Sequence, residues 1–166
     1  MILTYRKTAL NDLPEICRIV QSAVAAMERD HIFQWDHLYP AEEDFQEDAA
    51  EGRLYVGLAD GQLAVVYALN QKYDQEYENG KWNYQNEPFY VLHRLCVNPV
   101  FQNKGIATAA LLHIEAQVTE LGVHLLRLDV FSRNPYALKL YRSLGYSEAG
   151  YADWRKGRFI LMEKRF

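Results

Sequence analysis

The sequence predicts a mixed α/β domain of three layers, in which the strands of one sheet are flanked by helices on both sides. The chain has 166 residues, which suits a single domain with one core. Its apolar residues switch repeatedly between the alternation of strands and the 3.6-residue period of helices. No repeat, linker or low-complexity segment interrupts them. We therefore expect residues 1–166 to form a single domain.

Composition and charge narrow the class of protein. Hydrophobic residues make up 49% of the chain and charged residues 24%, as in an ordinary globular protein. No apolar run approaches the ~20 residues that span a bilayer, and the start "MILTYRKTALND" lacks the pattern of a signal peptide. The net charge of −4 argues against nucleic-acid binding. We expect a cytoplasmic protein with neither a membrane nor a nucleic acid as its partner.

The first half of the chain predicts two helices and three strands. Asn11-Asp12 with Pro14 just behind marks a helix start, and Asp60-Gly61 between two apolar runs is a strong hairpin signal. Gly52 ends a short acidic helix. The expected elements are a strand at 2–8, a helix at 13–29, a helix at 41–51 and a hairpin at 53–70.

The second half predicts the remaining strands and helices. Residues 71–88 are polar and aromatic without any period, which indicates an excursion from the sheet. Gly122 stops one helix, whereas Asn134-Pro135 starts the next and Gly145 ends it. The expected elements are a strand at 89–97, a helix from about 104 to 121, a strand at 124–131, a helix at 134–145 and a closing pair of strands at 146–166.

The stretch "VNPVFQNKGIATAALLHIEA" carries the first functional signal. Its apolar stripe places a helix start at Lys104 or Gly105, where free N–H groups and the helix dipole favour an anion. Gly105 would let a bulky ligand approach the backbone. The Walker pattern GxxxxGK[ST] and the dinucleotide pattern GxGxxG are both absent. The loop therefore suits a phosphate or pyrophosphate, although a simple tight turn is the alternative.

This stretch resembles the cofactor-binding segment of the GNAT superfamily of N-acetyltransferases. The match comprises Leu95-Cys96-Val97, then Asn98-Pro99, then Gln102-x-x-Gly105-x-Ala107, with Ala107 where many members have glycine. The resemblance implies that the backbone of Leu95, Cys96 and Val97 binds the pantetheine arm of acetyl-CoA at a splayed strand edge. It also implies a cradle for the pyrophosphate formed by the N–H groups of Gln102, Asn103, Lys104, Gly105, Ile106 and Ala107.

"SRNPYALKLYRSLGYSEAG" resembles the other hallmark of that family, in Asn134, Ala137, Leu140, Tyr141, Gly145 and Tyr146. Asn134 and Tyr141 are seven residues apart and share one stripe of a short helix. A phenol titrates near ~10 and a thiol near ~8.5, so a neutral tyrosine can protonate a leaving thiolate. The resemblance implies this general-acid role for Tyr141 and contact of Asn134 with the cofactor arm. The two segments define an acetyl-CoA-binding core at about 89–150.

The sequence does not decide which residue accepts the proton of the amine. Family members often carry a glutamate on the strand before the phosphate loop, but "FYVLHRLCV" has no carboxylate. His93 is the nearest titratable substitute in that strand. Other candidates lie around the end of the first helix: Glu28, Asp30, His31 and Asp36.

The acceptor amine is expected opposite the cofactor. Aromatic and acidic side chains suit an ammonium group through cation–π contacts and charge pairing. The candidates are Trp35, Asp36, Tyr39 and Trp82, for which simple packing is the alternative. No metal site is expected, because Cys17 and Cys96 are isolated and "HIEAQ" is not HExxH.

The first hypothesis is thus an acetyl-CoA-dependent N-acetyltransferase that acts by direct transfer in a ternary complex. A non-catalytic acetyl-CoA sensor on the same fold is the alternative, and a purely structural protein is a third. The resemblance implies a mostly antiparallel central sheet of about six to seven strands, splayed in the middle and flanked by about four helices. Homodimers are common among similar proteins, and the acceptor amine is not identified.

Overall fold

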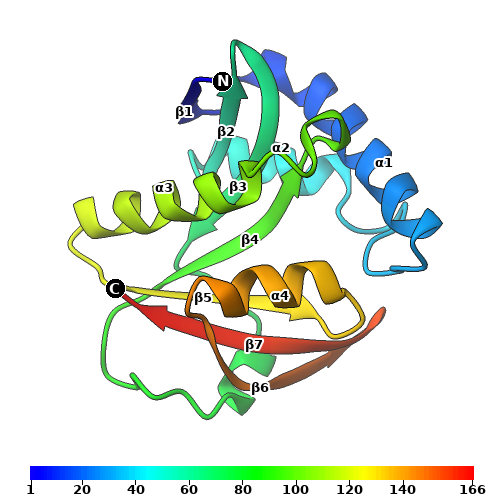
Figure 1. The fold of residues 1–166 in the computed structure, drawn as a ribbon. Coiled ribbons are helices and arrows are strands. Elements are labelled where there is room, and N and C mark those ends of the chain that lie inside the picture. The colour runs from blue at the N-terminus through cyan, green and yellow to red at the C-terminus, as the bar shows by residue number, and fades with distance from the viewer. The chain divides into compact units, whose positions relative to one another are not determined.

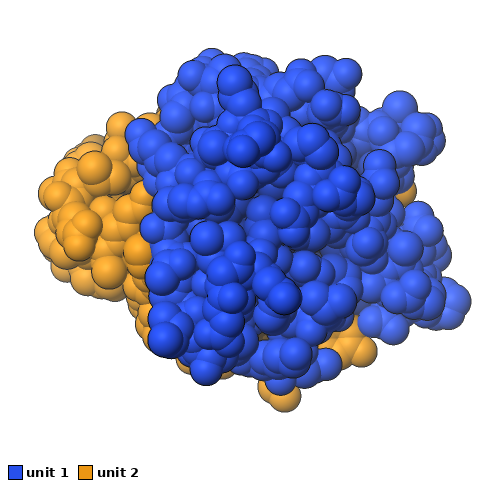
Figure 2. Space-filling model, turned by 90° about the horizontal axis from the view of Figure 1, so that it is seen from above, with its two compact units in different colours: residues 1–69, 93–110 blue, residues 70–92, 111–166 orange.

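The computed structural model describes residues 1–166 as two compact units, coloured separately in Figure 2. Unit 1 comprises Met1–Leu69 and His93–Ala110, and unit 2 comprises Asn70–Leu92 and Leu111–Phe166. The strands β3 (Gln62–Asn70) and β4 (Tyr90–Val97) and the helix α3 (Ile106–Glu120) contribute residues to both units.

The predicted elements are all present, with ends that agree within a few residues. They are β1 (Leu3–Lys7), α1 (Leu13–Arg29), α2 (Glu42–Ala50), β2 (Leu54–Ala59), β3 (Gln62–Asn70), β4 (Tyr90–Val97), α3 (Ile106–Glu120), β5 (Leu125–Phe131), α4 (Pro135–Ser143), β6 (Ser147–Trp154) and β7 (Gly157–Arg165). The strands hydrogen-bond in the order β1-β2-β3-β4-β5-β7-β6. The prediction of a mixed sheet of about six to seven strands with about four helices is confirmed by the seven strands and four α-helices of the structure.

In unit 1, helices cover both faces of the strands β2 and β3 (Figure 1). The apolar stripe of α1, including Ile16 and Val20, packs with Phe45 of α2 against residues such as Val66. The first turn of α3 packs Ile106 against the opposite face. The strand pairs β1-β2 and β2-β3 are antiparallel. Burial on both faces explains why β3 is apolar along nearly its whole length.

In unit 2, β7 pairs antiparallel with both β5 and β6. The first residues of β4 run parallel to β5, with Tyr90 opposite Leu126 and Val91 opposite Arg127. The short helix α4 lies across β5 (Figure 1). The excursion at 71–88 contains only a 3₁₀ turn, and its aromatic side chains pack with Leu161 of β7.

Candidate active site

The loop between β4 and α3 is fixed to the sheet by Asn98. Its backbone N–H donates to the carbonyl of Ala64 (2.8 Å), and its side-chain amide donates to the carbonyl of Leu63 (2.9 Å). A 3₁₀ turn follows at Pro99–Phe101. The loop therefore leaves β4 in a defined direction, set by two bonds to β3.

Gly105 turns this loop into the helix. It has a φ of +77°, and a Cβ added there would meet nothing within 4 Å. Asn103 is also left-handed, with a φ of +59°. The first N–H that bonds back within α3 belongs to Ala109, which donates to the carbonyl of Gly105 (3.0 Å). The N–H groups of Ile106, Ala107 and Thr108 thus precede the intrahelical bonds, which is the local geometry that an anion needs.

Not every peptide group of the expected cradle is available. The N–H of Gln102 donates to the carbonyl of Pro99 (3.2 Å) and is already used. The residues from Gln102 to Gly105 are exposed, whereas the side chain of Ile106 is buried. The ammonium of Lys104 lies 5.4 Å from the ring centre of Phe101. The backbone N–H groups that remain for an anion in this loop are therefore those between Asn103 and Thr108.

The residues of β4 just before the loop contribute backbone and packing. Leu95 and Val97 are half-buried and pack with the first turn of α3. Cys96 is buried on the opposite side, and this burial raises the pKa of its thiol to about 12. A thiol with this pKa is not a nucleophile at neutral pH. Cys96 is therefore a core residue.

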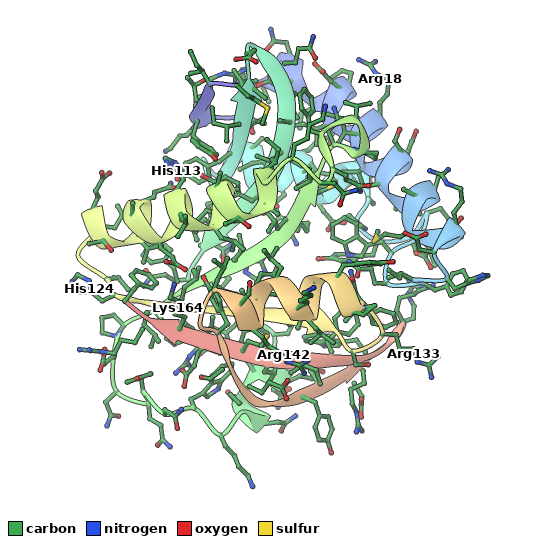
Figure 3. All side chains as sticks on the ribbon, viewed as in Figure 1. Arg18, His113, His124, Arg133, Arg142 and Lys164 are labelled. Carbon is green, nitrogen blue, oxygen red and sulfur yellow. The ribbon has the colours of Figure 1, made fainter.

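In unit 2, Asn134 and Pro135 start α4 as the sequence predicts. The side chain of Asn134 accepts a hydrogen bond from the N–H of Ala137 (3.1 Å) and caps the helix. Figure 3 shows Arg133 just before this helix and Arg142 in its last turn. Asn134 is 9% exposed, so the cap is a fixed structural feature.

Tyr141 lies buried on the inner side of α4 and is 8% exposed. Its ring meets that of Tyr146 edge to face, with 5.7 Å between the ring centres. The hydroxyl of Tyr146 donates to Glu115 (3.0 Å), which also accepts a hydrogen bond from Lys164 of β7 (2.8 Å). The ring of Tyr141 is therefore supported by an anchored neighbour.

The phenol of Tyr141 is neutral at physiological pH. Burial raises its pKa, and the negative charge of Asp129 raises it further. The hydroxyl makes no hydrogen bond within the protein. Tyr141 is thus a protonated phenol whose O–H group donates to no acceptor within the protein, which leaves it available as a general acid.

Asp129 was not among the residues expected from the sequence. It lies half-buried near the end of β5, where it accepts a hydrogen bond from the hydroxyl of Tyr77 (2.7 Å). The signal in the sequence is a single carboxylate within the otherwise apolar run "LDVF". Its effect on the pKa of Tyr141 places a negative charge near the phenol.

The expected base and acceptor residues occupy different environments. His93 is half-buried on β4 in unit 1. Trp35 is buried in the core of unit 1, and Asp36 accepts the N–H groups of Leu38 (3.0 Å) and Tyr39 (3.3 Å).

The two remaining acceptor candidates differ in exposure. Tyr39 is 39% exposed, and its hydroxyl accepts a hydrogen bond from Arg94 (3.0 Å). Trp82 of unit 2 is buried, donates its indole N–H to the carbonyl of Tyr77 (2.8 Å), and lies 4.1 Å from the guanidinium of Arg127. Of the three aromatic candidates, Tyr39 is the most exposed.

No three His, Cys, Asp or Glu side chains are grouped so that they could hold a metal ion. None of the helices combines the length and the apolarity that crossing a membrane requires.

Comparison with known proteins identifies the family. Residues 20–146, well over half of the chain, match the acetyltransferase (GNAT) family. The ribosomal protein bS18-alanine N-acetyltransferase of Escherichia coli is 29% identical over 120 residues, which cover 72% of each chain.

Solved structures show the same fold. A GNAT-family acetyltransferase from Streptococcus agalactiae superposes with a TM-score of 0.86 at 22% identity, over 99% of this chain and 95% of that one. The PaiA N-acetyltransferase of Thermoplasma acidophilum, in complex with coenzyme A, has a TM-score of 0.70 at 20% identity over 100% of both chains. The chain therefore belongs to the GNAT family of acetyltransferases and is an acetyl-CoA-dependent N-acetyltransferase.

Proposed function

We propose that residues 1–166 act as a single acyltransferase domain that moves the acetyl group of acetyl-CoA directly to a primary amine. Leu95–Val97 and Asn103–Ala107 of unit 1 hold the pantetheine arm and the diphosphate. Asn134 of unit 2 contacts the arm, and Tyr141 supplies a proton. The observation that carries the proposal is the buried, neutral phenol of Tyr141, whose hydroxyl has no partner within the protein.

The proposed reaction balances without any further reactant. The amine nitrogen attacks the carbonyl carbon of the thioester, a C–N bond forms, and the C–S bond breaks. The ammonium gives one proton to a protein base before the attack, and the base releases it to solvent. The thiolate takes the proton of Tyr141, and the second proton that the nitrogen loses as the amide forms restores the phenol. The products are an amide and the free thiol of CoA. Orientation of the two substrates supplies much of the rate, because the reaction becomes effectively unimolecular.

We assign the protein base to Asp129. A carboxylate accepts protons and pairs with an ammonium, which keeps the amine close while it loses its proton. Tyr77 holds one carboxylate oxygen of Asp129 at 2.7 Å. The electrostatic coupling of Asp129 to Tyr141 supports placing the base and the acid at one reaction centre. His93 is the second candidate for this role.

Replacement of Asp129 by asparagine should lower kcat by about 100-fold at pH 7. The α-amino group of a peptide has a pKa near ~8, so the rate of the variant should rise with pH as the free amine increases and level off above about pH 8. The measurement is the pH dependence of kcat/KM for the amine. Asp153→Asn is the matched control, because Asp153 is an exposed carboxylate of unit 2 that binds Arg158. A normal rate for Asp129→Asn would show that Asp129 is not the base and would leave His93 as the candidate.

Direct transfer predicts that no acetyl group is ever held on a cysteine. Cys96→Ala should keep kcat within about threefold of the wild type, although loss of a buried side chain lowers the melting temperature. Double-reciprocal plots with both substrates varied should intersect, as for a ternary complex. Parallel lines together with loss of activity in Cys96→Ala would indicate an acyl-enzyme instead.

The acceptor that we propose is the amino group of a peptide. The curated relative in E. coli is named for acetylation of an alanine of ribosomal protein bS18, so its acceptor is a protein amine. In this chain, the connection between α1 and α2 exposes Phe33, Leu38 and Tyr39. These apolar side chains could contact residues that follow the acceptor amine, which a small polyamine does not have.

The test is a panel of amines in which release of free CoA is measured. It includes peptides beginning with alanine, the same peptides blocked at the N-terminus, free amino acids, a polyamine and an aminoglycoside. We expect release above hydrolysis with the unblocked peptides and none with the blocked ones. Release of CoA only with small amines would mean that the acceptor is a small amine and not a peptide. No release while CoA still binds would favour a non-catalytic acetyl-CoA sensor.

A further inference from the structure

Arg94 has a backbone conformation that is rare for its residue type. It lies within the strand β4 but has a φ of +52°. Strand residues have negative φ values, and a bulky side chain with positive φ is strained. Such a residue persists only where its surroundings hold it in place.

Two residues of unit 1 hold the side chain of Arg94. Its Nε donates to Oδ2 of Asp48 on α2 (2.9 Å), and its Nη2 donates to the same oxygen. Its Nη1 donates to the hydroxyl of Tyr39 (3.0 Å). The side chain of Arg94 is 13% exposed and that of Asp48 is 6% exposed. All three nitrogens of the guanidinium thus donate a hydrogen bond, and the group is largely buried.

The two charges depend on each other. Burial raises the pKa of Asp48, and the positive charge of Arg94 opposes this effect. If Arg94 relaxed to a normal strand conformation, its side chain would leave Asp48 as a buried, unpaired carboxylate, which is strongly unfavourable. The ion pair therefore stabilises the left-handed backbone at Arg94.

This backbone position matters because Leu95 follows it directly. A residue with positive φ in a strand rotates the peptide groups after it out of the regular ladder, as in a β-bulge. Leu95–Val97 are the residues whose backbone is proposed to bind the pantetheine arm. Bulges are frequent next to active sites, where they redirect groups of the chain.

We propose that Asp48 and Tyr39 are positioning residues, which clamp Arg94 in its left-handed conformation and thereby aim the backbone of Leu95–Val97 at acetyl-CoA. This inference rests on the proposed function for the identity of the ligand. It gives the hydroxyl of Tyr39 a role in addition to the contact that we propose between its ring and the acceptor. It also gives the acidic helix α2 a role in cofactor binding, although neither residue touches the cofactor.

The first test compares Arg94→Gly with Arg94→Ala. Both variants lose the guanidinium, but only glycine adopts a positive φ without strain. We expect Arg94→Ala to raise the KM for acetyl-CoA by about 10-fold and Arg94→Gly to stay within about threefold of wild type. Melting temperatures verify that both variants fold. Equal loss in both would mean that the guanidinium itself binds a substrate, and unchanged values in both would mean that the bulge has no role. Either result overturns the proposal.

The second test is rescue of Asp48→Ala by Arg94→Gly. The single variant leaves the buried arginine without its counter-charge, so we expect a rise of about 10-fold in the KM for acetyl-CoA. Adding Arg94→Gly removes the unpaired charge and relieves the strain at once. The double variant should therefore bind acetyl-CoA better than Asp48→Ala alone. A double variant that is no better than the single one would contradict the clamp.

The same variants separate this inference from the proposed function. CoA binding can be followed by the shift in melting temperature, which needs no acceptor amine. If the wild type binds CoA but acetylates no amine, the proposed reaction fails and the clamp is still tested by the binding series. If the wild type acetylates an amine and the Arg94 and Asp48 variants all bind CoA equally, the clamp fails and the reaction stands.

Discussion

Tyr141→Phe should lower kcat by about 100-fold or more and leave the KM for acetyl-CoA within about threefold of the wild type. The change removes one hydroxyl, which makes no bond within the protein, and keeps the ring that packs against Tyr146. The fold should therefore be preserved while the thiolate loses its proton donor. The measurement is steady-state kinetics with both substrates varied, combined with CoA binding by thermal shift.

The control for this variant is Tyr136→Phe. Tyr136 is 68% exposed on the same helix, so its hydroxyl should be dispensable. Since burial raises the pKa of Tyr141, the wild-type enzyme should not lose its acid as the pH rises to ~10, the value of an ordinary phenol. Full activity in Tyr141→Phe would remove the general acid from the mechanism and leave solvent to protonate the thiolate.

Gly105→Ala should weaken CoA binding by about 10-fold or more, because it places a methyl group where the backbone is proposed to meet the diphosphate. The protein leaves room for that methyl group, since nothing lies within 4 Å of it. A loss of CoA affinity larger than backbone strain explains must therefore come from a clash between the added methyl group and the bound ligand. The measurement is a CoA titration by calorimetry or thermal shift.

Gly61→Ala is a closely matched control. Gly61 has a φ of +85° against +77° for Gly105, and a Cβ there also meets nothing within 4 Å. The two substitutions should thus cost a similar free energy of unfolding, about 1 kcal/mol. Gly61 lies in the turn between β2 and β3 and is not part of the loop that is proposed to bind the phosphates. Equal CoA affinity in both variants would show that the loop at Gly105 does not contact the phosphates.

The elements were predictable because local signals agreed with the tertiary packing. Asp60-Gly61 formed the hairpin turn with both residues at positive φ, and Asn134 capped α4 through its own side chain. The helix start near Gly105 followed from an apolar stripe that does pack against the sheet. Where sequence and packing requirements coincide, pattern alone locates an element.

The side-chain network of the site could be predicted only in part. Tyr141 and Asn134 lie in a recognisable motif, whereas the hydrogen bond from Tyr77 to Asp129 joins residues 52 positions apart. The pairing of Arg94 with Asp48, 46 positions apart, is equally invisible in one sequence. No propensity predicts a positive φ for an arginine within a strand, because the contacts that hold it there form only in the folded chain.

The central claim is that the peptide groups after Gly105 grip the diphosphate of CoA and thereby bring its sulfur to the hydroxyl of Tyr141. A crystal structure of the enzyme with bound CoA measures both parts directly. The account predicts phosphate oxygens within hydrogen-bond distance of the N–H groups at Ile106 and Ala107, with the sulfur at about 3–4 Å from the phenol oxygen. A diphosphate bound elsewhere, or a sulfur out of reach of Tyr141, would contradict it.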